Sequence, residues 1–428
     1  MLNMADIRGR DGVLPDGRPK GPVAYDSIVV NSNGIGAITF AARMARDPAF
    51  HGSVTVAAKP VAESRRLIDG CTLRARSVDY YAAALGTTRK AVLAAIYGPD
   101  WRQAETDHQR AALGTPFKGG VALGPCGVFM TSDKVKADRT AHQPLAYGVR
   151  NSRLMAALND LAGAAGVQFA NEPASSYDEL RALAKGSKPL IVNGTAKPIE
   201  GARAAMAAAS PRDFVAGAQM SFTSPRLKEA GNIGPNDSFV GMVNRDGALD
   251  LCVFYPLLDP LSPKARFYGI FYRAIRSASE ADKAREQQIL REQLEGVAYS
   301  LGLAPDDPDE TFAAAFVPVS PWRYIASRQE GVLDLSRISG GGCPIIAGDG
   351  MARAGLGGFA AAEAILAGEA PEPAMNKALT RWRQVNYVQF LAMTRMPNIS
   401  AFTMKTLPAL AFSGFNLQRD WDMWAGAY

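Results

Sequence analysis

The chain has 428 residues, of which 47% are hydrophobic and 21% are charged, a balance typical of proteins that fold around a packed core. This composition excludes a disordered, collagen-like or disulfide-scaffold chain. Lysine plus arginine exceed aspartate plus glutamate by only 47 to 41, with no basic run, so nucleic-acid binding is not indicated. With three histidines and four widely spaced cysteines, no zinc site is expected, and the thiols suggest a cytoplasmic protein.

Residues 1–22 are polar and rich in glycine and proline. They lack the apolar segment of a secretory signal, so we expect a flexible tail. Nowhere does the chain contain about 18 consecutive apolar residues, and no membrane-spanning helix is therefore expected.

The first strong pattern lies between residues 25 and 60. The apolar run Ser27–Val30 predicts a strand buried on both faces, and a small-residue turn follows it. The spacing then predicts a helix over 37–46 and a second strand over 53–57. A strand, turn, helix and strand within about 30 residues form a βαβ unit, which implies a parallel sheet.

Two further segments fit the same sheet. A helix is predicted over 151–165 and leads into a strand at 166–169, and the buried run 189–192 predicts another strand. From residue 213 to 274 the pattern changes to short alternating runs separated by turns, which predicts a mostly antiparallel sheet. Ser277 and Glu280 form a capping-box pattern that opens an amphipathic helix reaching about residue 301.

A third block contains a predicted strand over 343–347 that runs into Gly348-Asp349-Gly350. A glycine-rich turn over 355–358 and a helix over 359–366 are predicted to follow. The last 55 or so residues are aromatic and predicted to be helical. We expect them to cover the junction between two domains, with a membrane-facing or dimer-forming helix pair as the alternative.

These motifs, in this order, resemble the FAD-dependent aromatic hydroxylase superfamily. That superfamily includes single-component monooxygenases, styrene-type epoxidases, flavin halogenases and geranylgeranyl-reductase-like enzymes. The likeness spans about residues 25–371 and is closest around Ile345–Asp349. It implies an α/β fold with a three-layer, FAD-type Rossmann domain on a parallel sheet, an antiparallel-sheet substrate domain and C-terminal helices. The implied segments are 23–90, 140–200 and 317–375 for the Rossmann domain, 91–139 and 201–316 for the substrate domain, and 376–428 for the helices.

The resemblance also implies which residues contact FAD at its flavin end. Asp349, with Gly348, would bond the ribityl chain, and the next turn and helix would approach the pyrophosphate and the ring through Gly355, Gly357, Gly358 and Phe359. Backbone N–H groups at the start of a helix favour anionic ligand atoms, which agrees with that role. The alternative for Asp349 is a solvated turn carboxylate or a helix cap.

The adenosine end departs from the superfamily pattern. The phosphate-binding turn would comprise Asn31, Ser32, Asn33, Gly34, Ile35 and Gly36. Asparagine replaces two of the three glycines that let a backbone approach a pyrophosphate, although asparagine tolerates such turns. An ordinary strand-to-helix turn is the alternative.

Three more positions differ at this end. Ala58, followed by Lys59, stands where the superfamily has the ribose-binding glutamate, and Asn151 stands where it has arginine. Asn193-Gly194 replaces its second Asp-Gly pair. The flavin half of the site therefore matches the superfamily, while the adenosine half is altered.

Other candidates carry two interpretations each. Arg65 and Arg66 would lie against the cofactor or form a solvated basic loop. Trp322 and Tyr324 would line the substrate or belong to the core, and they lack the paired tryptophans of flavin halogenases. The isolated histidines are expected to be structural, so no catalytic side chain is identified.

The resemblance implies an FAD-dependent monooxygenase that hydroxylates or epoxidises an aromatic or polycyclic small molecule, in secondary metabolism or catabolism. Electrons would come from NAD(P)H or from a partner flavin reductase. Two alternatives stay open: a non-redox cyclase or isomerase, and a small-molecule binding protein, with flavin structural, weakly bound or lost. A homodimer is compatible with the sequence.

Overall fold

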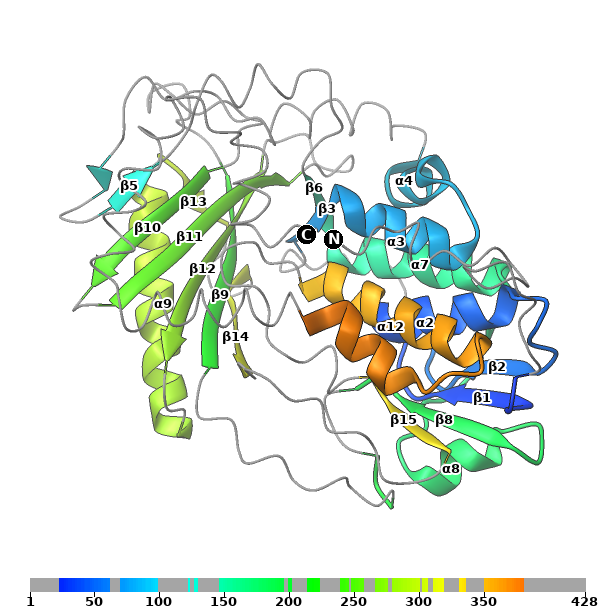
Figure 1. The fold of residues 1–428 in the computed structure, drawn as a ribbon. Coiled ribbons are helices and arrows are strands. Elements are labelled where there is room, and N and C mark those ends of the chain that lie inside the picture. The colour runs from blue at the N-terminus through cyan, green and yellow to red at the C-terminus, as the bar shows by residue number, and fades with distance from the viewer. Residues whose placement is uncertain are drawn as a thin grey trace.

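The computed structural model describes residues 23–61, 70–98, 122–123, 127–129, 146–195, 199–201, 214–223, 239–245, 248–257, 266–275, 279–300, 302–306, 311–318, 331–335 and 350–380. Figure 1 shows a parallel sheet with helices packed around it and, apart from it, an antiparallel sheet with its own helix. The fold is therefore α/β with a second, antiparallel unit, as the resemblance implies.

The parallel sheet has five strands within the described residues, in the order β15-β8-β1-β2-β7. Their bounds are β1 (Ser27–Val30), β2 (Ser53–Val56), β7 (Gln168–Phe169), β8 (Pro189–Asn193) and β15 (Val332–Asp334). This is the doubly wound order, in which the chain runs outward from the central strand β1 first to one side and then to the other. The direction reverses between β1 and β8, and ligands of such sheets bind at the carboxyl ends of the strands near that point.

Side chains of β1 alternate between two cores. Ile28 and Val30 are buried in the larger core, against the helices α2, α3, α7 and α12, and Val29 is buried on the opposite face with Leu180. The helix bounds are α2 (Ile35–Arg46), α3 (Ala75–Leu85), α4 (Arg89–Tyr97), α7 (Asn151–Ala164), α8 (Tyr177–Ala182) and α12 (Gly350–Leu366). In Figure 1 α8 lies on the opposite face of the sheet from α2 and α12, which gives three layers.

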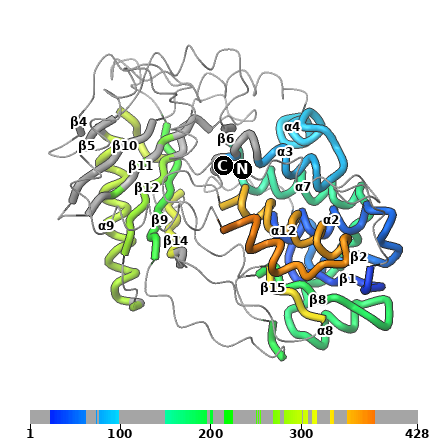
Figure 2. The backbone as a smooth tube through the Cα atoms, viewed as in Figure 1, coloured from blue at the N-terminus to red at the C-terminus, as the bar shows by residue number. Residues whose placement is uncertain are grey.

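Helices α2 and α12 belong to opposite ends of the chain and lie side by side (Figure 2). Their backbones touch at glycines. A Cβ atom on Gly358 would lie 2.1 Å from the carbonyl oxygen of Gly36, and one on Gly36 would lie 3.0 Å from that of Ala354. No side chain larger than hydrogen fits at Gly358 without moving a helix.

This packing corrects one prediction from the sequence. The glycines at 355–358 do not form a turn, because α12 starts at Gly350 rather than at Phe359 and runs straight through them. Each glycine lets a neighbour approach closely. The ring of Tyr81 lies over Gly355, where a Cβ atom would come within 2.7 Å of its Cε1.

Buried charges join the same two helices. The Arg43 side chain on α2, only 1% exposed, pairs with Asp47 at 2.8 Å between Nη2 and Oδ2, and its Nε pairs with Glu363 of α12. Removing one partner of a buried ion pair leaves an uncompensated charge and costs about 3–5 kcal/mol. The three side chains therefore fix the alignment of α2 along α12.

The antiparallel sheet has eight strands within the described residues. They are β4 (Ala122–Leu123), β5 (Gly127–Phe129), β9 (Phe214–Thr223), β10 (Phe239–Arg245), β11 (Ala248–Leu257), β12 (Arg266–Ile275), β13 (Ala304–Pro305) and β14 (Ala313–Pro318). The predicted change from parallel to antiparallel pairing is confirmed. Two shorter strands, β3 (Gly70–Arg74) and β6 (Ala146–Arg150), form a separate antiparallel pair that the sequence did not indicate.

Helix α9 (Glu280–Ser300) covers one face of this sheet. Leu290 and Leu294 of the helix are fully buried against Phe222, Phe254 and Phe271 of three strands. The predicted amphipathic helix is thus confirmed, with its apolar side on the sheet.

The cap of α9 differs from the prediction. Ser279 and Asp282 make the reciprocal bonds: the Asp282 amide donates to the Ser279 hydroxyl oxygen at 3.1 Å, and the Ser279 amide donates to the Asp282 carboxylate at 3.1 Å. Ser277 lies outside the described residues. The sequence offers two serines with an acid three residues later, and only the path of the chain decides between them.

The helix crossing gives a paired stability test. Gly358→Ala is expected to destabilise the protein by about 3 kcal/mol, because the added methyl group collides with backbone rather than with a movable side chain. Gly357→Ala, one residue earlier, is expected to be neutral or stabilising by up to about 1 kcal/mol, since its methyl group would meet only the ends of two flexible side chains, Leu379 Cδ1 at 3.4 Å and Met375 Cε at 3.9 Å, and alanine favours helix. Denaturant unfolding of the two variants measures the difference. Equal unfolding midpoints would contradict the close backbone contact at Gly358.

Candidate functional site

The turn between β1 and α2 lies where the sheet order predicts a ligand site. Gly34 is the N-cap residue of α2, and no side chain caps the helix. The Ser32 hydroxyl oxygen accepts the Gly34 amide at 3.0 Å and so shapes the turn before the helix begins. By contrast, Thr88 caps α4 and Ser176 caps α8. The start of α2 therefore has backbone donors and a positive dipole end available to an anionic group.

The side chain of Asn31 links this turn to β8. Its amide nitrogen donates to the Asn193 side-chain oxygen at 2.9 Å, and its amide oxygen accepts the backbone N–H of Gly194 at 2.8 Å. The Asn193 oxygen also accepts the Thr195 hydroxyl at 3.0 Å. At the last residue of β15, Asp334 lies 3.5 Å from the Asn193 amide nitrogen. A chain of polar side chains thus crosses the carboxyl edge of the sheet from β1 to β15.

Gly194 completes the junction on the β8 side. A Cβ atom there would lie 2.8 Å from the Cβ atoms of Ser32 and Ala37. The glycine of the Asn193-Gly194 pair is therefore needed for close packing under the turn.

The side chain of Asn33 bridges the turn in the other direction, toward β2. Its amide nitrogen donates to the carbonyl oxygen of Lys59 at 2.7 Å. Lys59 follows Ala58, the residue in the place of a ribose-binding acid. The asparagines of the turn thus reach both neighbouring strands, Asn31 to β8 and Asn33 to β2.

The structure describes some of the other candidate residues, whereas others lie outside the described residues. Asn151 is the exposed first residue of α7, and Phe359 is buried within α12. Gly36, Gly355, Gly357 and Gly358 lie in helices α2 and α12, and contact with a cofactor stays a prediction for each of them. Arg65, Arg66, Trp322, Tyr324, Gly348 and Asp349 lie outside the described residues.

The sequence did not single out any residue of the antiparallel sheet. On the face turned away from α9, Gly217, Gln219 and Tyr272 are partly exposed, whereas their neighbours on the α9 face are buried. Tyr272 lies against Gly217 on the adjacent strand, where a Cβ atom would approach its ring to 3.3 Å. The signal that could have found them is the alternation of side chains along β9 and β12.

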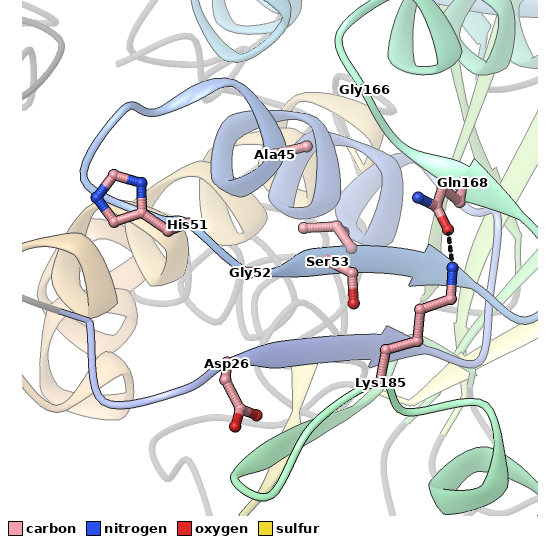
Figure 3. A pocket seen from close by; sticks show the side chains of 9 residues that line it. Asp26, Ala45, His51, Gly52, Ser53, Gly166, Gln168 and Lys185 are labelled. Carbon is pink, nitrogen blue, oxygen red and sulfur yellow. Dashed lines mark hydrogen bonds between the residues drawn. The ribbon is translucent and has the colours of Figure 1, made fainter.

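A polar hollow of about 320 Å³ lies at the opposite edge of the parallel sheet. Figure 3 shows Asp26 and Ser53 near the starts of β1 and β2, with Lys185 donating to Gln168 at 2.7 Å. The lining residues are Asp26, Ala45, His51, Gly52, Ser53, Val54, Gly166, Gln168 and Lys185. Because ligands of doubly wound sheets bind at the carboxyl ends of the strands, this hollow does not mark the expected site.

The Asp26 carboxylate in that hollow already has partners. It accepts the backbone N–H groups of Ser187 at 2.8 Å and of Lys188 at 2.9 Å. Desolvation acts to raise the pKa of the Asp26 carboxyl, but the hydrogen bonds from Lys188 and Ser187 outweigh it and hold the pKa below its ordinary value. The group joins the loop before β8 to the start of β1, which is a structural role.

Among the helices of the described residues, none is both long and apolar enough to cross a membrane. Within the same residues, no three His, Cys, Asp or Glu side chains gather as a metal site would require.

The comparison with known proteins gives likeness of structure only. No protein-family model matches the chain, and no curated protein matches it. Among solved structures, the chain is similar to the tetrameric form of 2-methyl-3-hydroxypyridine-5-carboxylic acid oxygenase, with 16% identity over 90% of this chain and 94% of that chain and a TM-score of 0.47.

Two further structures show similar values. FqzB is 12% identical over 90% of this chain and 86% of that chain, with a TM-score of 0.46. The tetracycline destructase Tet(51) is 12% identical over 90% and 96%, with a TM-score of 0.43. Values below 0.5 are too low to decide fold or function, so the proposal that follows stands on this chain's own residues.

Among the described residues, the β1–α2 turn offers a place for a phosphate group but lacks the contacts for an adenosine ribose. The uncapped start of α2 suits a phosphate group. At the adenosine end, the Asn33 side chain crosses to Lys59, and Ala58 offers no carboxylate to a ribose hydroxyl.

The depressed pKa of Asp26 has a consequence for stability. A carboxyl whose pKa is lower in the folded state stabilises the fold above its unfolded pKa, and that contribution disappears as the pH falls through the folded pKa. Asp26→Asn is therefore expected to lower the free energy of unfolding at neutral pH, with the difference from the parent protein shrinking below about pH 4. Urea unfolding across that range measures it. Asp160→Asn, at an exposed position on α7, is the control, and an equal loss at all pH values for Asp26→Asn would contradict the assignment.

Proposed function

We propose that this chain is a flavin-dependent monooxygenase that hydroxylates or epoxidises an aromatic or polycyclic small molecule. One observation carries the proposal. The two segments with the predicted cofactor motifs, 300 or so residues apart in the sequence, lead into α2 and α12, and these helices pack directly against each other at Gly36, near the start of α2, and at Gly358, in the middle of α12. The Gly348-Asp349 pair lies outside the described residues, and in the sequence it immediately precedes Gly350, the first residue of α12.

A bound flavin would supply the electrons that activate oxygen, chemistry that no side chain provides. The chain's own part is to bind and orient. The start of α2 would hold a phosphate, and Asp349 would accept a hydrogen bond from the ribityl chain. The antiparallel sheet would form the substrate side through the face that carries Gln219 and Tyr272.

The electron source, the oligomeric state, the location and the metabolic role are part of the proposal and are not observed. Electrons would come from NAD(P)H or from a partner flavin reductase. The discontinuous domain boundaries, a homodimer, a cytoplasmic location and a role in secondary metabolism or catabolism stay predictions from the sequence.

A second candidate, a non-redox cyclase or isomerase or a binding protein on the same scaffold, is favoured by one observation. The amide of Asn33 bridges the turn to Lys59 in the place where a dinucleotide would pass. A chain that no longer needed FAD would tolerate that bridge.

The visible spectrum of the purified full-length chain separates the two candidates. We expect the absorption bands of oxidised flavin, either as purified or after addition of flavin, and bleaching by NAD(P)H if the chain accepts hydride itself. A spectrum with flavin bands that only an added reductase can bleach would assign the electron source to a partner. Failure of any flavin to bind would overturn the monooxygenase proposal.

The placement of the flavin end is tested at Asp349. Asp349→Ala is expected to weaken flavin binding by roughly 1.5–3 kcal/mol, about 10- to 100-fold in Kd, because it removes a charged acceptor from a ligand hydroxyl. Fluorescence titration with flavin measures the change. Asp160→Ala on α7 should leave the Kd unchanged, and an unchanged Kd for Asp349→Ala would remove Asp349 from the site.

A further inference from the structure

The Asn33 bridge lies at the one place that a dinucleotide must occupy and a mononucleotide need not. In a dinucleotide-binding βαβ unit, the second glycine of the turn lets the backbone approach the pyrophosphate, and an acid at the end of the second strand holds the adenosine ribose. Here Asn33 occupies the glycine position, and its side chain donates to the carbonyl oxygen of Lys59, the residue after the acid's position, at 2.7 Å. One hydrogen bond therefore joins the two places that the adenosine half would contact.

The end of β2 offers no replacement for the missing acid. Ala58 has no polar side-chain atom, and the Lys59 carbonyl that could accept a ribose hydroxyl already accepts the Asn33 amide. An adenosine moiety would thus have to share the Lys59 carbonyl oxygen with the Asn33 amide and would gain no carboxylate in return. Both effects lower the affinity for a dinucleotide.

The β1–α2 turn is also held in place on its other side, so it cannot shift to make room for an adenosine moiety. Asn31 holds it to β8 through bonds of 2.9 and 2.8 Å to Asn193 and Gly194. Gly194 packs directly beneath Ser32, since even a methyl group there would come within 2.8 Å of the Ser32 Cβ. The position of Asn33 is therefore fixed from the β8 side, and only rotation of its own side chain can release Lys59.

We propose that the cofactor cradle of this chain ends at the phosphate next to the flavin, so that it binds flavin mononucleotide, FMN, in preference to FAD, and that Asn33 is the residue that sets this preference. The inference rests on the proposed function, since it presumes a flavin. FMN carries one phosphate, which the uncapped start of α2 can receive, and it needs neither the space that the Asn33 side chain crosses nor a ribose acid.

The test is a binding titration, which needs no knowledge of the substrate. The full-length chain, freed of any bound flavin, is titrated separately with FMN and with FAD while flavin fluorescence is followed. FMN is expected to bind at least about tenfold more tightly than FAD. Asn33→Gly is expected to tighten FAD by about tenfold and to change the FMN Kd by less than about twofold, and Asn33→Ala should act in the same direction.

Asp160→Ala, at an exposed position on α7, is the control. It leaves the hydrogen bonds of Asn31 and Asn33 in place, so the ratio of the two Kd values should stay as in the parent chain. A parent chain that binds FAD as tightly as FMN would overturn this inference and leave the flavin enzyme standing. Binding of neither flavin would overturn both. If Asn33→Gly leaves the ratio unchanged, or if Asp160→Ala shifts the ratio equally, Asn33 does not set the preference.

Discussion

The contact on which the rest of the molecule depends is the crossing of α2 and α12 at Gly36 and Gly358, backbone against backbone. It brings together segments from the two ends of the chain, each of which begins just after a predicted cofactor motif. Because protein interiors are close-packed, a single methyl group at this point has no space to enter. The distance between the two helices at this crossing is therefore set by the absence of side chains.

Ion pairs add to the glycine contact by fixing how α2 is aligned along α12. Arg43 pairs with Asp47, the residue that follows the end of α2, and with Glu363 on α12, deep in the interface. A buried ion pair loses its compensation when the partners separate, so these pairs resist movement of one helix along the other. The glycines allow α2 and α12 to pack closely, and the ion pairs fix their alignment. Together they hold the two helices in one relative position.

At the carboxyl edge of the parallel sheet, amides have taken positions that glycine and acid occupy in the superfamily that the sequence resembles. Their side chains bond to protein atoms: Asn31 to β8 and Asn33 to the end of β2. These hydrogen bonds therefore hold the turn to both neighbouring strands. A site can keep its fold, its helix start and its phosphate-binding capacity while the shape of its ligand changes, because these properties depend on different atoms.

The sequence by itself determined the parts whose signals are local. The apolar run Ser27–Val30 and the change to alternating runs after residue 213 predicted the parallel and antiparallel sheets, and the glycine and asparagine pattern predicted a turn from residue 31, although α2 already begins at Ile35. Sequence could not assign the glycines of α12, since a glycine required by a neighbouring helix and one required by a turn are the same residue in the chain. The three-residue strand β15 was too short for any periodic signal and was recognised only through its pairing with β8. Tertiary structure alone decided that Asn33 bonds to Lys59, because that hydrogen bond joins residues 26 positions apart and exists only when β1 and β2 lie side by side.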